Sequence, residues 1–211
     1  MVTPVPSRSA ATRALILDVA AAEFSTHGYR RSSVDSVSRR AGVSRATLYQ
    51  YWRSKEQLFR ALVEHLHEQH LSAMQAVLDD PPGGPVENLA AILQARFGRF
   101  VALTSTSGNA DELYDVHDRV CGDIALAAEQ RGRDLIAQLL RRAIDDGQLD
   151  LSAAEVGVDQ AAALLIDCAH AAKGPNPAAA TPAEFAVRIA QLMRLVVNGL
   201  RPGPDRPTKK S

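Results

Sequence analysis

Apolar residues recur at intervals of three and four along most of this chain, and that spacing predicts helices. The alternating pattern typical of strands is almost absent. Clusters of glycine and proline, above all the segment from Asp79 to Gly84, mark the ends of the longer helices. The sequence therefore predicts an all-α protein. The expected longer helices span about 54–79, 85–103, 111–131 and 133–146, with two more before residue 200.

Two short helices are predicted between Ser32 and Leu58. Ser32 can cap the first, with Asp35 at its N3 position in a weaker form of the capping box. Gly42 can adopt the left-handed conformation that a sharp helix end requires, and Ser44 is placed to cap the second helix. The two helices therefore meet across a tight turn, as in a helix-turn-helix.

The second short helix, Arg45 to about Trp52, is expected to bury Leu48 and Trp52 and to leave its other side chains outside. Arginine reads guanine bidentately, alanine can meet a thymine methyl group, and Thr and Tyr hydroxyls reach phosphate. Lys55, in the first turn of the next helix, also favours a phosphate. These side chains suit a nucleic acid. The outward-facing set is Arg45, Ala46, Thr47, Tyr49 and Gln50.

Charge is divided between two parts of the chain. The 211 residues carry 24 basic and 24 acidic side chains, so the formal net charge is zero. Residues 1–60 hold ten Lys or Arg against four Asp or Glu, a net charge of +6, and the remainder carries −6. Taken by itself, the positive charge of residues 1–60 could be that of an ordinary solvated surface. The helix-turn-helix pattern in the same residues favours phosphate binding instead.

Several motifs follow one another at fixed spacing: Ile16, Ala20, Ala21, Phe24 and Gly28, then Ala41-Gly42-Val43-Ser44, Thr47-Leu48-Tyr49, Tyr51-Trp52 and Ser54-Lys55-Glu56 with Leu58. Together they resemble the DNA-binding domain of TetR-family transcriptional regulators. The resemblance covers about residues 10–60, and beyond it only the all-helical plan matches. Ser38 and Trp52 stand where the family usually has Ala and Phe, and both replacements are conservative in size.

This resemblance implies that Thr47, Tyr49 and Lys55 bind phosphates. It also implies that Arg45 and Ala46 face bases, and that Ser32 or Ser33 lies on the DNA backbone. In such proteins the C-terminal helices form a four-helix dimer bundle, and the helices after the DNA-binding domain enclose an apolar ligand pocket with a few polar groups. The full set expected at DNA is Ser32, Ser33, Ser44, Arg45, Ala46, Thr47, Tyr49, Gln50, Tyr51 and Lys55.

Four segments are expected along the chain. Residues 1–9 contain two prolines and no apolar period, so a flexible arm is predicted. Residues 10–56 form the helix-turn-helix DNA-binding domain, and residues 57–200 form a helical regulatory and dimerisation domain. Residues 201–211 are proline-rich and basic, which predicts a disordered tail.

The last two predicted helices carry the pattern expected of an assembly surface. Ser152 with Glu155, and Thr181 with Glu184, are spaced as capping boxes that would begin these helices. Their apolar faces exceed what one neighbouring helix covers, so a dimer interface is favoured over packing into the chain's own core. The predicted dimerisation residues are Leu164, Leu165, Phe185, Ile189, Leu192, Met193 and Val196.

Candidate ligand-binding residues are chosen from polar and aromatic side chains on the predicted regulatory helices. A metal site among the nearby histidines is disfavoured, because only His67 and His70 share a face and no third ligand has a fitting spacing. No cofactor is therefore expected. The predicted ligand-binding set is His70, Phe97, Phe100, Tyr114, His117 and Cys121.

An enzyme is disfavoured because the chain contains none of the common hydrolase, metalloprotease or nucleotide-binding motifs. No segment approaches the ~18 to 20 continuous apolar residues of a membrane span, and Cys121 and Cys168 lack metal-binding spacing. We therefore expect a cytoplasmic protein with reduced thiols and no membrane association.

The function expected is that of a homodimeric repressor that binds a palindromic double-stranded DNA operator and is released by a small-molecule effector. An activator or a ligand-independent regulator of the same architecture stays open as the alternative. A helical interaction protein without DNA activity is a more distant possibility.

Overall fold

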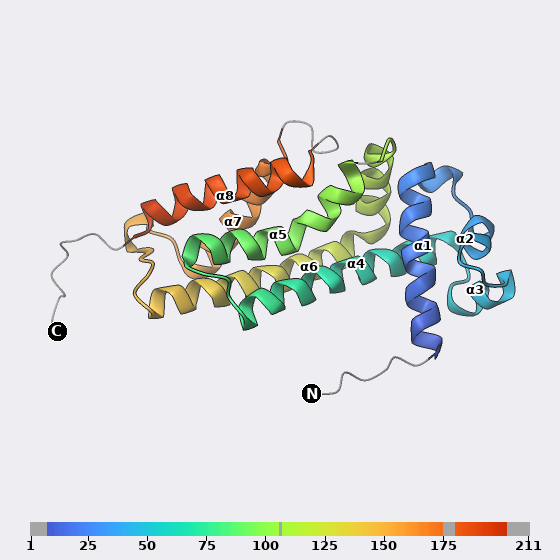
Figure 1. Cartoon of the computed structure of the whole chain (residues 1–211), viewed down its shortest axis with the longest axis horizontal. Helices are drawn as coiled ribbons and strands as arrows, with labels where there is room; N and C mark the ends of the chain where they lie inside the picture. Colours follow the sequence, from blue (N-terminus) through green and yellow to red (C-terminus); the bar gives the residue numbers. More distant parts are fainter. Residues whose placement is uncertain (1–7, 106, 175–179, 202–211) are drawn as a thin grey trace. The chain divides into compact units, whose positions relative to one another are not determined.

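The computed structural model describes residues 8–105, 107–174 and 180–201, and the described part of the chain contains helices and no strand (Figure 1). The predicted all-α fold is confirmed. Its elements are α1 (Arg8–Arg31), α2 (Val34–Arg40), α3 (Arg45–Tyr51), α4 (Lys55–Asp79), α5 (Pro85–Ser105), α6 (Ala110–Asp145), the 3₁₀ turn η1 (Ser152–Ala154), α7 (Val158–Ala172) and α8 (Pro182–Gly199).

The chain forms two compact units. Unit 1 comprises the described residues of 1–69 and 102–128, and unit 2 those of 70–101 and 129–211. The boundary predicted between residues 56 and 57 differs from the division into compact units, which falls inside α4. The reason is that Leu58 and Leu62 of α4, together with Val116 of α6, are buried in the same core as α1. Both α4 and α6 therefore contribute residues to both units.

The core of unit 1 joins the first four helices through large apolar side chains. Ile16 and Leu17 of α1 and Leu48 of α3 are fully buried. Phe24, Tyr29 and Phe59 form an aromatic cluster whose ring centroids are 5.1 to 5.7 Å apart. Aromatic pairs at such distances add to the stabilisation from area burial alone. This core fixes α2 and α3 on α1.

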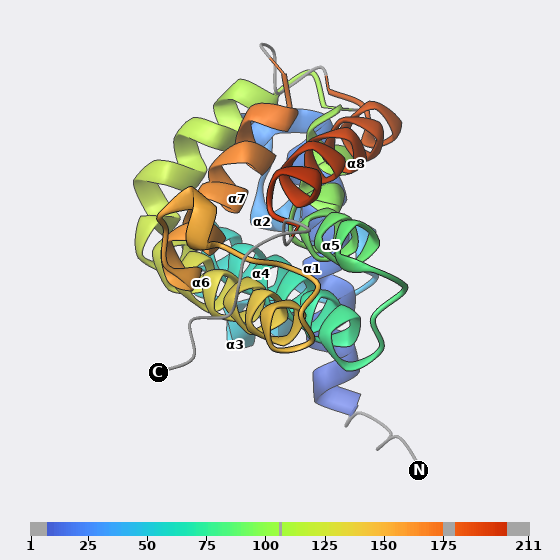
Figure 2. The ribbon, with the colours of Figure 1, turned by 90° about the vertical axis from the view of Figure 1, so that its left-hand side faces the viewer.

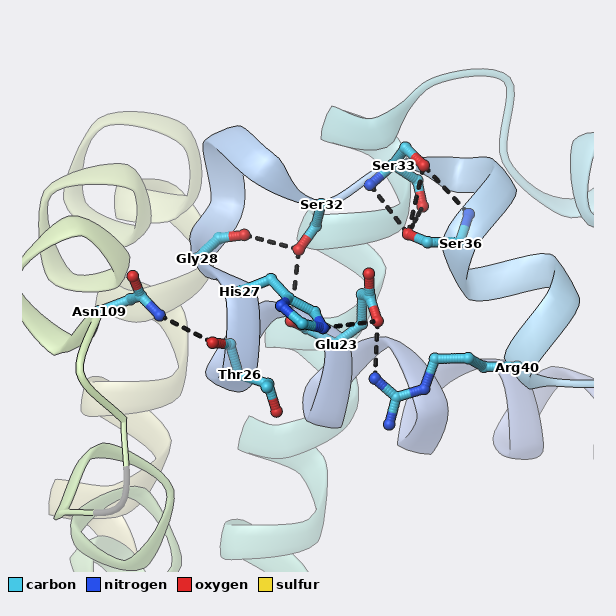
Figure 3. Close-up of polar contacts among 9 residues, drawn as sticks. All are labelled: Glu23, Thr26, His27, Gly28, Ser32, Ser33, Ser36, Arg40 and Asn109. Atoms are coloured by element: carbon cyan, nitrogen blue, oxygen red, sulfur yellow. Dashed lines mark hydrogen bonds and ion pairs between the residues drawn. The ribbon is translucent and has the colours of Figure 1, made fainter.

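The end of α1 changes direction at Gly28, whose φ of 76° and ψ of 167° are not helical. The positive φ is the reason that glycine is needed here, because the nearby Glu112 carboxylate is the end of a flexible side chain and can move aside. The buried Ser32 hydroxyl donates to the carbonyl of Gly28 at 2.6 Å (Figure 3). Ser32 therefore stabilises this bend.

Ser33, and not Ser32 as predicted, is the N-cap of α2. Its hydroxyl accepts from the backbone of Ser36 at 3.0 Å, and the Ser36 hydroxyl lies 3.1 Å from the backbone nitrogen of Ser33. The prediction was wrong by one residue because both serines precede the same apolar run, and only the bend at Gly28 decides which side chain turns inward.

Expectations for the chain ends are partly corrected. Because α1 begins at Arg8, the last two residues of the predicted arm are helical. The remaining arm, residues 1–7, and the tail from residue 202 lie outside the described residues. No helix among the described residues is both long and apolar enough to cross a lipid bilayer.

The two helices predicted at 111–131 and 133–146 are one helix, α6, which continues through Gly132. Gly132 was expected to break the helix, but it is buried, and the Arg96 and Met74 side chains pack against it. The irregularity instead lies at Cys121, with φ −127° and ψ 15°. There the Arg60 guanidinium donates to the carbonyl of Val120 and satisfies it.

In unit 2, α7 and α8 pack against each other (Figure 2). The predicted capping box of Thr181 and Glu184 is confirmed: Glu184 N donates to the Thr181 hydroxyl at 3.2 Å, and Thr181 N donates to the Glu184 carboxylate at 3.1 Å. The box predicted for Ser152 and Glu155 is wrong. Ser152 begins a short 3₁₀ turn, and α7 starts at Val158 behind Gly157.

A buried carboxylate links α1 to α2. Glu23 is 4% exposed and accepts a hydrogen bond from the Arg40 guanidinium at 2.7 Å (Figure 3). Burial by itself would raise the pKa of Glu23, but hydrogen bonds from Ser36 and Arg40 outweigh it and hold the pKa below its ordinary value.

We expect Glu23→Gln to lower the free energy of unfolding by about 1–3 kcal/mol at neutral pH, because the charge-assisted bond is lost. Since the pKa is lowered in the folded state, the stabilisation is present above the ordinary Glu pKa of about 4.3 and is lost as the pH falls through the folded pKa. Urea unfolding of both proteins between pH 7 and pH 3 should show the difference shrinking. The exposed Asp18→Asn serves as control, and a constant difference would contradict this account.

Candidate nucleic-acid interface

The turn between α2 and α3 has the hydrogen-bonding pattern of a Schellman motif. Gly42 N donates to the carbonyl of Arg39 at 3.3 Å, and Val43 N donates to the carbonyl of Ser38 at 3.1 Å. Gly42 has a φ of +67°, as the sequence predicted. Because the turn is closed by backbone bonds alone, its geometry leaves the neighbouring side chains for other contacts.

The N-terminus of α3 is capped by Ser44, as predicted. Its hydroxyl accepts from the backbone of Thr47 at 3.0 Å, and the two hydroxyl oxygens are 2.8 Å apart. Ser44 is exposed and Thr47 is partly exposed. Two hydroxyl groups and the free N–H groups of a helix start therefore occur together, and such a group of donors can bind a phosphate.

The outer face of α3 carries four exposed side chains: Arg45, Ala46, Tyr49 and Gln50. The inner face holds Leu48, which is fully buried, and Trp52 follows at the C-cap with 5% exposure. Each of these six residues lies on the side that the sequence pattern predicted. The separation of faces leaves polar and small side chains available to base edges.

Arg45 is held by weak contacts on this face. Its Nε lies 3.0 Å from the carboxylate of Asp35, and its guanidinium lies 5.4 Å from the centre of the Tyr49 ring. The Arg45 side chain is 65% exposed, so the ion pair is screened by water and contributes little to stability. Arg45 can therefore exchange Asp35 for another acceptor at small cost.

Lys55 occupies a different position from the one expected. Its Nζ donates to the carbonyl groups of Tyr29 at 2.8 Å, Arg30 at 3.3 Å and Ser32 at 3.1 Å. It also lies 4.5 Å from the centre of the Tyr29 ring. An ammonium group has three donors, and these carbonyls use all of them. In this arrangement Lys55 stabilises the end of α1 and its donors are engaged within the chain, so its contact with phosphate stays a prediction.

Two further predicted DNA residues are engaged inside unit 1. Ser32 is 3% exposed and its hydroxyl donates to Gly28, so the prediction that its side chain contacts DNA is wrong. Tyr51 is partly buried, and its hydroxyl lies 3.0 Å from that of Ser9 in α1. Ser33, by contrast, is exposed at the start of α2 and fits the expected backbone contact.

The structure does not bring the six predicted ligand-binding residues together in one unit. His70, Phe97 and Phe100 belong to unit 2, whereas Tyr114, His117 and Cys121 belong to unit 1. Cys121 is fully buried in the core of unit 1, and burial raises its pKa to about 11. Its role is that of an apolar core residue, so its assignment to a ligand pocket is corrected. Sequence reasoning missed Arg96 and Lys173, two buried cations of unit 2.

The predicted dimer surface is also corrected. Four of its residues are at most 4% exposed within the single chain and form the protomer's own core: Leu165, Phe185, Ile189 and Met193. Leu164 is 48% exposed, and Leu192 and Val196 are partly exposed. Val187 and Leu195, which are 57% and 73% exposed, were not among the predicted residues. Helical spacing indicated that both helices are amphipathic. It did not indicate which face of each helix is buried in the protomer's own core.

The sequence profile described as bacterial regulatory proteins of the tetR family matches residues 16–62. TtgR of Pseudomonas putida, an HTH-type transcriptional regulator, is 24% identical over 168 residues, covering 75% of this chain and 80% of TtgR. The transcriptional repressor KstR2 of Mycolicibacterium smegmatis is 28% identical over 97 residues, 46% of this chain and 47% of that protein. These relatives are regulators and not enzymes.

Among solved structures, a SmeT–triclosan complex superposes with a TM-score of 0.59 at 23% identity, covering 93% of this chain and 100% of that one. The likeness supports the fold, and the matched profile spans the helices that build the turn and the outer face of α3. Residues 16–62 therefore carry the DNA-binding domain of the TetR family of bacterial transcriptional regulators, and TtgR, which matches most of the chain, is a helix-turn-helix regulator.

Proposed function

We propose that this protein is a repressor that binds a palindromic operator as a homodimer and leaves it when a small-molecule effector binds. The observation that carries the proposal is the exposed outer face of α3 beside the capped turn. TetR-family regulators bind DNA as dimers and respond to small molecules. KstR2, which is similar to this chain, is a repressor, and SmeT has been obtained with triclosan.

The direct contacts to DNA are assigned by exposure. Arg45, Ala46 and Gln50 face bases, because their side chains project from the outer face of α3. Ser33, Ser44, Thr47 and Tyr49 hold phosphates through hydroxyl groups. One recognition helix reads few base pairs, so specific binding needs two copies related by a two-fold axis. The two copies then contact half-sites whose centres are about 34 to 36 Å apart on the DNA.

The surface proposed for dimerisation lies on α7 and α8. Val187 and Leu195 are separated by eight residues and lie on one face of α8, and Leu164 is an exposed leucine of α7. Large apolar side chains exposed near one another favour a partner over water. A second copy of this chain, bringing the same two helices, forms the four-helix bundle typical of the family.

Effector release requires that binding in unit 2 changes the DNA-binding helices. α4 contributes residues to both units, and Arg60 of α4 pairs with Asp123 of α6 at 2.7 and 3.0 Å. A change in the tilt of α4 would alter the separation of the two recognition helices. Coupling of about 1–3 kcal/mol would change operator affinity by about 5- to 150-fold, provided that the effector prefers the released state.

For DNA recognition we expect Arg45→Ala to reduce discrimination at particular base pairs by about 1–3 kcal/mol, because a bidentate base contact is lost. Tyr49→Ala should weaken binding to operator and random DNA alike. Footprinting on the DNA beside the protein's own gene supplies the operator, and fluorescence anisotropy measures both affinities. Equal losses on both DNAs for Arg45→Ala would remove it from base reading, and failure of the wild type to bind either DNA at low salt would overturn the function.

Lys55→Met should lower the free energy of unfolding by about 1–3 kcal/mol, because three carbonyl groups lose their donor. Operator binding should weaken with it, while the slope of log affinity against log salt stays that of the wild type. A slope smaller by about one would instead indicate a direct phosphate contact. Chemical denaturation and salt-titrated anisotropy together distinguish a structural role of Lys55 from a direct phosphate contact. Arg53→Met, at an exposed residue, is the matched control.

For assembly we expect Leu195→Asp to weaken dimerisation about tenfold or more, because an unpaired carboxylate would be buried at the interface. Leu195 is 73% exposed within the chain, so the protomer's fold should be unaffected. Sedimentation equilibrium measures the dimer affinity. Leu126→Asp, at an equally exposed leucine of α6, is the control, and an unchanged affinity for Leu195→Asp would exclude this face of α8.

A further inference from the structure

Two buried cations converge on one aromatic ring in unit 2. Arg96 of α5 is 9% exposed and Lys173, at the C-cap of α7, is 6% exposed. The Arg96 guanidinium lies 5.1 Å from the centre of the Phe97 ring, and the Lys173 ammonium lies 5.0 Å from the same centre. Both charges therefore lie about 5 Å from a single point in a largely apolar interior.

The hydrogen-bonding capacity of these cations is largely unused within the described part of the chain. Arg96 Nε is buried there without an acceptor, and no carboxylate of those residues bonds to either cation. Lys173 Nζ lies 3.4 Å from Nδ1 of His170, a long contact. The carboxylate of Glu129 interacts electrostatically with Arg96, but Glu129 forms its ion pair with Arg133.

Burying two such charges without an anion is costly, because desolvation of each ion opposes folding and like charges repel. Desolvation first, and then the Arg96 charge, lower the pKa of Lys173 to about 8. Desolvation and the charges of Arg96 and Arg99 lower the pKa of His70 to about 4. Cation–π contacts with Phe97 and Phe100 offset part of this cost, but a ring cannot accept five guanidinium N–H groups.

Packing against α6 also keeps Arg96 Nε out of contact with water. The position that a Cβ of Gly132 would occupy lies 3.3 Å from Arg96 Nε, so the guanidinium is stacked on the backbone of α6. The region is otherwise lined by rings, with Phe185 6.4 Å from Phe97 between centroids. The Arg96 charge acts on Lys173, so an anion that reached both groups would relieve the repulsion between them, with the aromatic rings beside it.

We propose that Arg96 and Lys173 bind the carboxylate of the effector, and that this effector is an apolar carboxylic acid whose body packs on Phe97 and Phe100. The inference rests on the proposed function and specifies the class of its effector. A planar guanidinium matches a carboxylate bidentately, and the Phe97, Phe100 and Phe185 rings favour a ligand with an apolar body over a free phosphate.

The test compares the full-length wild type with Arg96→Met and Lys173→Met, and uses Arg131→Met, at an exposed residue of α6, as control. Thermal unfolding and calorimetric titration are run with octanoate and 4-phenylbutyrate, their neutral amides, and inorganic phosphate. We expect the carboxylates alone to stabilise the wild type, with binding on the order of 10- to 100-fold weaker in both variants and unchanged in the control. Without ligand, both variants should unfold at a higher temperature than the wild type, since an unpaired buried charge is removed.

Several results would overturn the proposal. If the neutral amides bound as tightly as the carboxylates, the charge of the ligand would have no role in binding. If inorganic phosphate bound as tightly, the apolar body of the ligand would have no role. No effect of either carboxylate at millimolar concentration, or lower ligand-free stability of both variants, would identify the cations as structural. Operator anisotropy is measured in parallel: a carboxylate that binds without releasing DNA supports this site and contradicts effector release, whereas absence of DNA binding contradicts only the proposed function.

Discussion

The carbonyl groups at the end of α1 impose the constraint on which the DNA-binding unit depends. A helix that ends in a bend leaves its last carbonyl groups without intrahelical donors, and in a buried setting these must be satisfied. Lys55 supplies one ammonium to the carbonyls of Tyr29, Arg30 and Ser32, and the Ser32 hydroxyl supplies another donor to Gly28. Because Lys55 begins α4, this arrangement fixes α4 against the α1–α2 junction.

The same constraint explains how much the sequence could predict. Caps and turns are local, so Gly42, Ser44 and the Thr181–Glu184 box could be identified from spacing alone. Ser32 and Lys55 could not, because their partners depend on a bend at Gly28 and on a residue more than twenty positions away. A lysine at a helix start suggests phosphate by its chemistry, whereas the observed carbonyl contacts require knowledge of the tertiary packing.

The other wrong predictions also concern side chains whose burial depends on the tertiary packing. Helical spacing recognises that Phe185, Ile189 and Met193 share a face, but it does not tell the protein's own core from a partner's surface. The exposed Val187 and Leu195 lie on the remaining face, which a single sequence marks only as mixed polar and apolar. Cys121 was likewise assigned to a pocket from its neighbours in sequence, although it fills the core beside α1.

Charge is arranged differently in the two units, and the difference has a physical consequence. In unit 1 the single cation of α3, Arg45, is exposed, so it keeps its hydration and holds Asp35 weakly. In unit 2, Arg96 and Lys173 are buried beside Phe97, where desolvation raises the free energy of the charged forms. A protein tolerates such a cost only while the rest of the fold offsets it, and the cost becomes useful when an anion is bound, because the ligand then removes an existing penalty. Relief of that penalty shifts a conformational equilibrium only when the anion binds one conformation more tightly than the other.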